Sequence, residues 1–157
     1  MIHLATGIAL REEHLLLAAS RYPNQPQPLW NLPGGRQQPG ELLEETVARE
    51  FLEETSLRVS VRELAYVSES YDGDRHFLNA TFVVDVIEGS SFGGACPERG
   101  RDHVVGVEWV ALGEVRERIA VAVVREPLVA FLEGRLARRY AGYHEAGVTI
   151  EWPDGSV

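Results

Sequence analysis

The stretch of residues 32–57, LPGGRQQPGELLEETVAREFLEETSL, joins a glycine-rich turn to one long helical pattern. Pro39 and Gly40 give a second turn signal, and no proline or glycine interrupts the fifteen residues that follow. We therefore predict a helix over residues 41–55. Its main apolar stripe, at helical spacing, consists of Leu43, Val47 and Phe51.

Three glutamates of this helix are expected to lie close together. Glu50, Glu53 and Glu54 fall on an arc of about 100° at the helical angle per residue. Like charges at this spacing destabilise a helix by a few tenths of a kcal/mol per pair, which a solvated acidic surface tolerates. The alternative is a ligand site, because the cluster follows a turn whose glycine backbone can approach a ligand and because hard cations prefer carboxylate oxygens.

Residues 35–57 resemble the Nudix box, G-x5-E-x7-R-E-U-x-E-E-x-G-U, in which U is a bulky apolar residue. The matching residues are Gly35, Glu41, Arg49, Glu50, Phe51, Glu53, Glu54 and Leu57. Ser56 departs from the pattern, because the family has a glycine there that usually ends the helix with a positive φ, and serine tolerates that conformation less well. The resemblance to this MutT-like family implies a single domain over residues 1–157. The implied fold is α/β, an α/β/α sandwich with a mixed β-sheet between helices.

The resemblance also implies a function. It predicts a metal-dependent hydrolase that cleaves the phosphoanhydride bond of a nucleoside diphosphate linked to another group, X. The implied ligands of Mg²⁺ or Mn²⁺ are the carbonyl of Gly35 and the carboxylates of Glu50, Glu53 and Glu54. Two other classes remain open: a Nudix module that senses nucleotides without cleaving them, and a structural protein whose acidic helix is only solvated.

Catalytic roles are implied for Glu41, Arg49, Glu50 and Glu53. Arg49 would orient a glutamate through a charge-assisted hydrogen bond, or else form a helical i,i+4 pair with Glu45. Glu41 would brace the junction between loop and helix or approach the metals. Glu53 is our preferred general base or bridging ligand.

Substrate contacts are expected outside these acids. Arg36 and Arg75 are candidates to bind phosphates, and Tyr71, fourteen residues past Leu57, is a further candidate for the substrate site. The loop before the late strand offers Glu98, Asp102 and His103, and Glu108 follows beside Trp109. Of these, Asp102 or His103 is our preferred contribution to the catalytic site from outside the box.

The remaining chain reads as strands, loops and one more helix. Alternating or continuous apolar residues predict strands at 6–10, 14–20, 57–71, 75–89 and 104–112, with a hairpin turn at residues 72–74. Residues 21–35 and 89–103 are expected to be loops. A second helix is predicted over 125–140 with Pro127 in its first turn. The tail from about residue 141 either adds a strand or stays mobile.

Composition narrows the class of partner. The net charge of −9 argues against nucleic-acid binding, although a small anionic nucleotide can still bind through cations. No apolar run is long enough to cross a membrane, and the first twenty residues lack the features of a signal peptide. Because Cys96 is the single cysteine, we expect a cytoplasmic protein. The second helix and residues 148–152 would either form a homodimer interface or complete the monomer.

Overall fold

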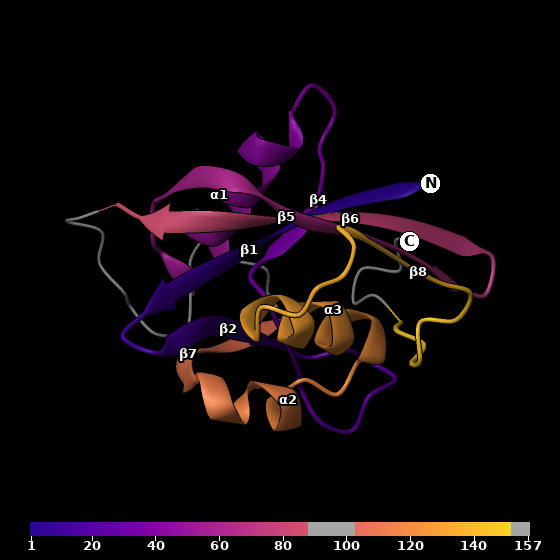
Figure 1. The fold of residues 1–157 in the computed structure, drawn as a ribbon. Coiled ribbons are helices and arrows are strands. Elements are labelled where there is room, and N and C mark those ends of the chain that lie inside the picture. Colours follow the sequence, from indigo (N-terminus) through magenta and orange to yellow (C-terminus); the bar gives the residue numbers. More distant parts are fainter. Residues whose placement is uncertain (88–102, 152–157) are drawn as a thin grey trace.

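Two layers of helices enclose a mixed β-sheet in the computed structural model, which describes residues 1–87 and 103–151 (Figure 1). The strands are β1 (Ile2–Arg11), β2 (His14–Ser20), β3 (Leu29–Asn31), β4 (Gly34–Arg36), β5 (Val59–Asp72), β6 (Arg75–Val86), β7 (Val104–Ala111) and β8 (Tyr140–Tyr143). The helices are α1 (Leu43–Thr55), α2 (Val115–Arg118) and α3 (Ala122–Leu132). A short 3-10 turn, η1 (Leu112–Glu114), precedes α2. The predicted α/β sandwich is confirmed.

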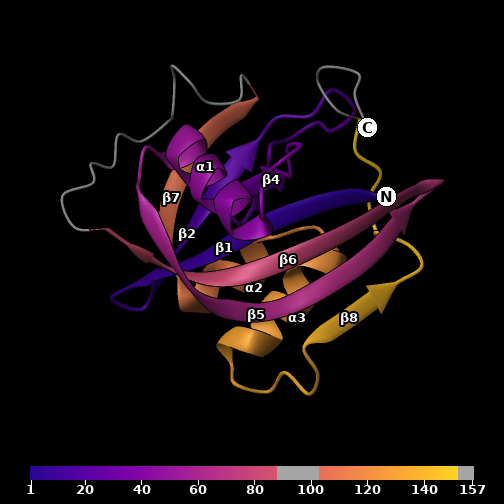
Figure 2. The same ribbon diagram turned by 90° about the horizontal axis from the view of Figure 1, so that it is seen from above.

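The strand order is β3-β2-β1-β6-β5-β8, with β4 paired to β1 and β7 paired to β2. The β1–β6 and β5–β8 pairs are parallel and the others are antiparallel, so the sheet is mixed. Gly35 and Ala80 both pair with Ala5, on opposite edges of β1. Viewed from above, α1 lies on one side of the sheet, and α2 and α3 lie on the other (Figure 2).

The core beneath α1 sets the position of that helix. Val47 and Phe51, from the predicted apolar stripe, are fully buried. A Cβ on Gly7 of β1 would lie only 2.5 Å from the Phe51 ring, so the ring rests directly on the strand backbone. This contact fixes which side of α1 faces the sheet and therefore where the glutamates point.

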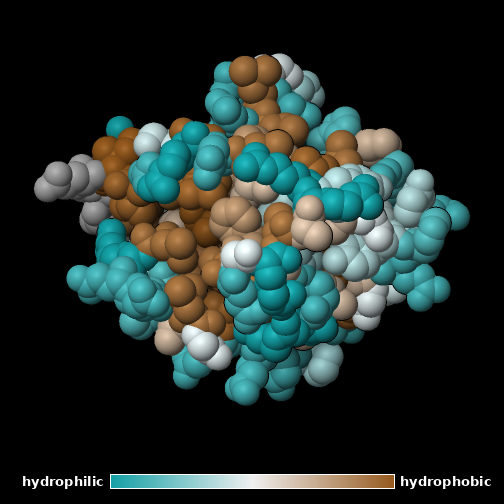
Figure 3. Space-filling model, in the orientation of Figure 1, coloured by the Kyte–Doolittle hydropathy of each residue, from teal (hydrophilic) through white to brown (hydrophobic). Residues whose placement is uncertain are grey.

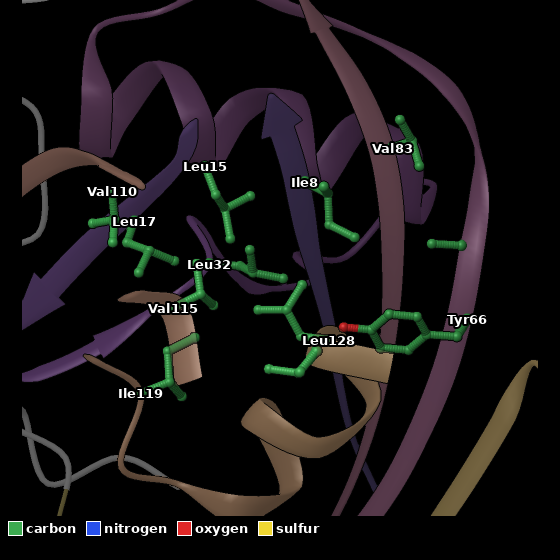
Figure 4. Close-up of a cluster of buried hydrophobic side chains, with 12 residues drawn as sticks. Ile8, Leu15, Leu17, Leu32, Tyr66, Val83, Val110, Val115, Ile119 and Leu128 are labelled. Carbon is green, nitrogen blue, oxygen red and sulfur yellow. The ribbon is translucent and has the colours of Figure 1, made fainter. Parts of the chain in front are cut away.

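A second core lies on the opposite face of the sheet (Figure 4). Leu128 of α3 lies near Ile8 of β1, and Ile119, which follows α2, lies beside Val115. All four are completely or almost completely buried. Tyr66 of β5 lies at the edge of this cluster, with its ring 6.0 Å from that of Phe131. Each helical layer therefore has its own apolar core against the same sheet.

The prediction for the second helix was wrong at both ends. The helix α3 begins at Ala122, so Pro127 lies in its second turn, and it ends at Leu132. Gly134 follows with a φ of 70°, a left-handed conformation that terminates helices. The strand β8 then begins at Tyr140, close to the residue at which we had placed a strand or a mobile tail. The predicted loop over residues 21–35 likewise contains the short strand β3 and the first two residues of β4.

Residues 149–151 form a strap between two distant segments. Asn24 donates to the carbonyl of Thr149 at 2.8 Å and accepts from the backbone amide of Glu151 at 2.9 Å. Arg75, at the tip of the β5–β6 hairpin, donates to the carbonyl of Ile150 at 2.9 Å. This part of the tail and the buried side of α3 therefore complete the monomer.

The surface carries both apolar and polar areas. Figure 3 shows more hydrophobic side chains on the left half of that face, with hydrophilic ones over α3. Leu10, Leu64 and Ile87 are among the exposed large apolar residues, and a homodimer stays a prediction. Within residues 1–87 and 103–151, no helix is long and apolar enough to cross a membrane. Cys96, Glu98 and Asp102, together with most of the predicted loop 89–103, lie outside the described residues.

Candidate active site

The strand β4 carries the glycine turn to the acidic side of α1. The backbone amide of Gly34 donates to Glu54 Oε1 at 2.8 Å. A Cβ on Gly35 would lie 2.5 Å from Glu50 Oε1, and a Cβ on Gly34 would lie 2.2 Å from the carbonyl oxygen of Ala5. A side chain at either position would therefore clash. The absence of one at Gly34 allows β4 to pair with β1, and its absence at Gly35 allows the Glu50 carboxylate to lie against the backbone.

Arg49 gathers three of the glutamates around one guanidinium group. Its Nε donates to Glu41 Oε1 at 2.5 Å, and its Nη1 lies 3.1 Å from Glu50 Oε1 and 3.2 Å from Glu53 Oε2. Its Nη2 donates to the carbonyl of Arg36 at 2.9 Å, which ties α1 to β4. The expected charge-assisted bond from Arg49 to a glutamate is present.

Glu45 contacts the start of α1, whereas the alternative prediction paired it with Arg49 at i,i+4. Its Oε2 accepts from the backbone amide of Leu42 at 3.3 Å, the residue just before α1. This contact satisfies a backbone N–H at the start of the helix, where intrahelical acceptors are lacking. Glu45 therefore helps to begin α1.

Glu41 lies just before α1 and braces the junction between loop and helix. Its Oε2 accepts from the backbone amide of Gln38 at 3.0 Å, from the Thr46 hydroxyl at 2.8 Å and from Arg49 Nη2 at 3.2 Å. The Arg49 hydrogen bond, helped by those from Gln38 and Thr46, lowers the pKa of Glu41 to about 2. In return, the Glu41 hydrogen bond raises the pKa of Arg49. Both groups stay charged over the whole physiological pH range.

The three glutamates on α1 differ in accessibility. Glu50 is completely buried and Glu54 is 5% exposed, whereas the side chain of Glu53 is 28% exposed. Burying carboxylates is costly unless they are paired or hold a cation. Glu50 and Glu53 share one guanidinium nitrogen, and Glu54 is held by the glycine turn.

These oxygens fit a hard divalent cation in their chemistry. Mg²⁺ and Mn²⁺ prefer carboxylate and carbonyl oxygens, and the Glu50 carboxylate lies close against the backbone of Gly35. Among the described residues, however, no three acidic, histidine or cysteine side chains already converge as a metal site. Carboxylates held by Arg49 would have to turn toward the ion on binding.

The residues proposed for substrate binding lie in separate places. Tyr71 stacks on His76, with ring centroids 4.2 Å apart, and Arg75 bonds to Asp72 Oδ2 at 2.9 Å. At roughly 3.3 Å per residue, Arg75 lies about 16 Å along β6 from Ala80, which is level with Gly35. The structure therefore does not bring Tyr71 and Arg75 together with the acidic cluster.

His103 contacts a different tyrosine. Its ring lies 5.7 Å from that of Tyr22, and its carbonyl accepts from the backbone amide of Arg21 at 2.7 Å. Burial and, to a smaller extent, the charge of Glu54 raise the pKa of Tyr22. Among the other candidates for a contribution from outside the box, Glu108 is held by Arg118 at 3.0 Å.

Thr46 was missed by the reasoning from sequence. It is fully buried, and its hydroxyl contacts Glu41. A signal was available, since Thr46 precedes Glu50 by four residues and Glu53 by seven, the spacing of one helix face.

Known proteins resemble this chain in sequence and in fold. The NUDIX domain family model matches residues 1–131. A candidate 8-oxo-dGTP diphosphatase of Bacillus subtilis (strain 168) is 33% identical over 110 residues, which cover 69% of this chain and 65% of the relative. An ADP-ribose pyrophosphatase of Methanocaldococcus jannaschii is 36% identical over 92 residues, which cover 56% of this chain and 54% of the relative. The chain thus spans less than two thirds of either curated relative.

A solved structure shares the fold. A NUDIX hydrolase from Nitrosomonas europaea superposes with a TM-score of 0.71 at 22% identity, covering 89% of this chain and 92% of that one. A similarity at 22% identity shows the shared fold and nothing further. The family model, however, spans most of the chain and includes the whole of residues 35–57. The chain belongs to the NUDIX domain family.

Proposed function

We propose that this chain is a metal-dependent pyrophosphohydrolase that cleaves the phosphoanhydride bond of a nucleoside diphosphate linked to another group. The observation that carries this proposal is the organisation of the acids: Arg49 holds Glu50 and Glu53, and the Gly34 amide holds Glu54. A merely solvated acidic helix would not bury two of its glutamates against a glycine turn.

The four proposed ligands are the Gly35 carbonyl and the carboxylates of Glu50, Glu53 and Glu54. Bound there, Mg²⁺ or Mn²⁺ would neutralise phosphate charge and lower the pKa of water. Glu53 is the most exposed of the three glutamates, so it is our choice to accept a proton from the attacking water. Arg49 keeps the carboxylates oriented, and the partly buried Glu41–Arg49 pair anchors Arg49 to the loop.

The relatives support a nucleotide derivative but not one substrate. One is named for 8-oxo-dGTP and the other for ADP-ribose, and both names describe molecules with a phosphoanhydride bond. We therefore propose the class of small nucleotide anhydrides. Both compounds belong in the assay, together with nucleotide sugars and dinucleoside polyphosphates.

The test is turnover of this panel with Mg²⁺ and with Mn²⁺ for the wild-type chain and two variants. Glu53→Gln removes the proposed base, whereas Glu44→Gln makes the same chemical change at an exposed position in the first turn of α1. We expect Glu53→Gln to lose at least a hundredfold in kcat, on the order of the contribution of general-base catalysis, and Glu44→Gln to match the wild type. Tight nucleotide binding without turnover would instead identify a nucleotide-sensing module.

A further inference from the structure

Thr46 is a buried threonine whose hydroxyl reaches into the acidic cluster. Its Oγ1 lies 2.8 Å from Glu41 Oε2 and 3.2 Å from the carbonyl oxygen of Leu42. A hydroxyl has one hydrogen to donate, and a carboxylate is a stronger acceptor than a carbonyl. The shorter distance and the charge of Glu41 therefore indicate that the proton is directed to Glu41.

The bond to Thr46 restricts how the Glu41 carboxylate can turn. Arg49 meets both oxygens of Glu41 through Nε and Nη2, an arrangement that makes the two groups nearly coplanar. The Gln38 amide and the Thr46 hydroxyl both donate to Oε2 and hold that plane in place. Because Thr46 is fully buried on a regular helix, its hydroxyl is a fixed reference point.

Orientation passes from Glu41 to the proposed catalytic residues through a rigid group. The guanidinium of Arg49 is planar, so fixing Nε and Nη2 also fixes Nη1. Nη1 is the atom that contacts both Glu50 and Glu53. A small rotation at Glu41 would consequently displace two carboxylates at once.

We propose that Thr46 is a positioning residue of the active site, acting through Glu41 and Arg49 on Glu50 and Glu53. This inference deepens the proposed function and rests on it for its effect on turnover. The competing explanation is that Thr46 only fills space in α1 and returns its proton to the preceding turn, as buried threonines in helices often do.

Two substitutions separate these explanations. Thr46→Val keeps the shape and removes the hydroxyl, whereas Thr46→Ser keeps the hydroxyl and removes a methyl group. We expect Thr46→Val to lower kcat about tenfold with little change in KM, as expected for a misplaced catalytic group. Thr46→Ser is expected to restore kcat to within about twofold of the wild type, even if it lowers Tm more.

A second measurement does not depend on turnover. In ¹⁵N-edited NMR spectra, the Arg49 Nε–H should give a resonance protected from exchange with water, identified by its loss in Arg49→Lys. We expect exchange of this hydrogen to accelerate in Thr46→Val and to stay slow in Thr46→Ser. Thr55→Val is the matched control, because Thr55 is also fully buried on α1 but donates to the Phe51 carbonyl at 2.6 Å. It should lower Tm without changing the Arg49 signal.

The outcomes are distinct. If Thr46→Val keeps both the wild-type kcat and the slow Arg49 exchange, Thr46 only fills space and the inference is wrong. If the wild-type chain cleaves nothing in the panel while the Arg49 signal responds to Thr46→Val but not to Thr46→Ser or Thr55→Val, the positioning role stands and the proposed activity fails.

Discussion

The backbone amide of Gly34 donates a hydrogen bond to Glu54 Oε1 across a separation of twenty residues. This bond connects the glycine turn to the last glutamate of α1, so the turn and the helix hold one another in register. It also means that Glu54 has a structural contact that must be separated from its proposed role as a metal ligand.

Glu54→Gln makes that separation. The amide oxygen of glutamine can still accept from Gly34, but it carries no negative charge for a cation. We expect Tm to change by only a few degrees. Turnover should fall at least a hundredfold, which is about the loss expected when a group that stabilises the charge of the transition state is removed. Thermal unfolding with and without Mn²⁺, together with kcat, checks this. Wild-type stabilisation by Mn²⁺ in the variant would contradict a ligand role for Glu54.

Gly35→Ala tests the contact between the turn and Glu50. The new Cβ would lie 2.5 Å from Glu50 Oε1, and Glu50 is buried and held by Arg49, so the carboxylate has to move. We expect a loss of roughly tenfold or more in kcat from the misplaced carboxylate. Gly113→Ala is the control, because a Cβ there meets nothing within 4 Å. Equal activity of the two variants would show that Glu50 tolerates displacement.

Ser56→Gly should stabilise the protein. Ser56 ends α1 with a φ of 64°, the conformation for which the family pattern has glycine. A left-handed non-glycine residue costs about 1–2 kcal/mol, part of which is offset by the greater freedom of glycine in the unfolded chain. We expect the free energy of unfolding to rise by about 0.5–1 kcal/mol in urea titrations. Ser56→Ala, which keeps the Cβ, should give no such gain.

Acid should weaken the fold partly through Glu41. Its pKa is lowered on folding from 4.5 to about 2, so the contribution of Glu41 to stability is present above about pH 4.5 and is lost as the pH falls toward 2. Urea unfolding between pH 2 and 7 should therefore show a shallower acid limb for Glu41→Gln than for the wild type. The exposed Glu44→Gln should keep the wild-type slope, and the same slope in all three proteins would contradict the prediction.

Much of this fold could be read from local pattern. The helix α1, the strands β1 and β2 and the turn between β5 and β6 follow from apolar periodicity and glycine signals, which act over a few residues. The end of α3 could have been placed at Gly134, whose left-handed φ stops the helix well before Tyr140. The strands β3 and β4 have only three residues each, and their assignment depends on partners in β2 and β1.

The site was predictable as a set of residues but not as a set of contacts. Helical spacing places Glu50, Glu53 and Glu54 on one arc, whereas the choice of Glu41 over Glu45 as the partner of Arg49 depends on how the preceding loop folds back. The guanidinium of Arg75 is engaged by Asp72 and by the carbonyl of Ile150, a residue 75 positions away. Contacts of that sequence separation are set by tertiary structure.

The strap of residues 149–151 has a kinetic consequence. Asn24 bonds to residues 125 and 127 positions away, and joining such distant segments costs entropy before many other contacts exist. These hydrogen bonds should therefore form after the folding transition state. Asn24→Ala is expected to accelerate unfolding in stopped-flow measurements and to leave the refolding rate unchanged, whereas slower refolding would place the strap in the nucleus. On this view the strap governs how long the folded molecule lasts, rather than how fast it forms.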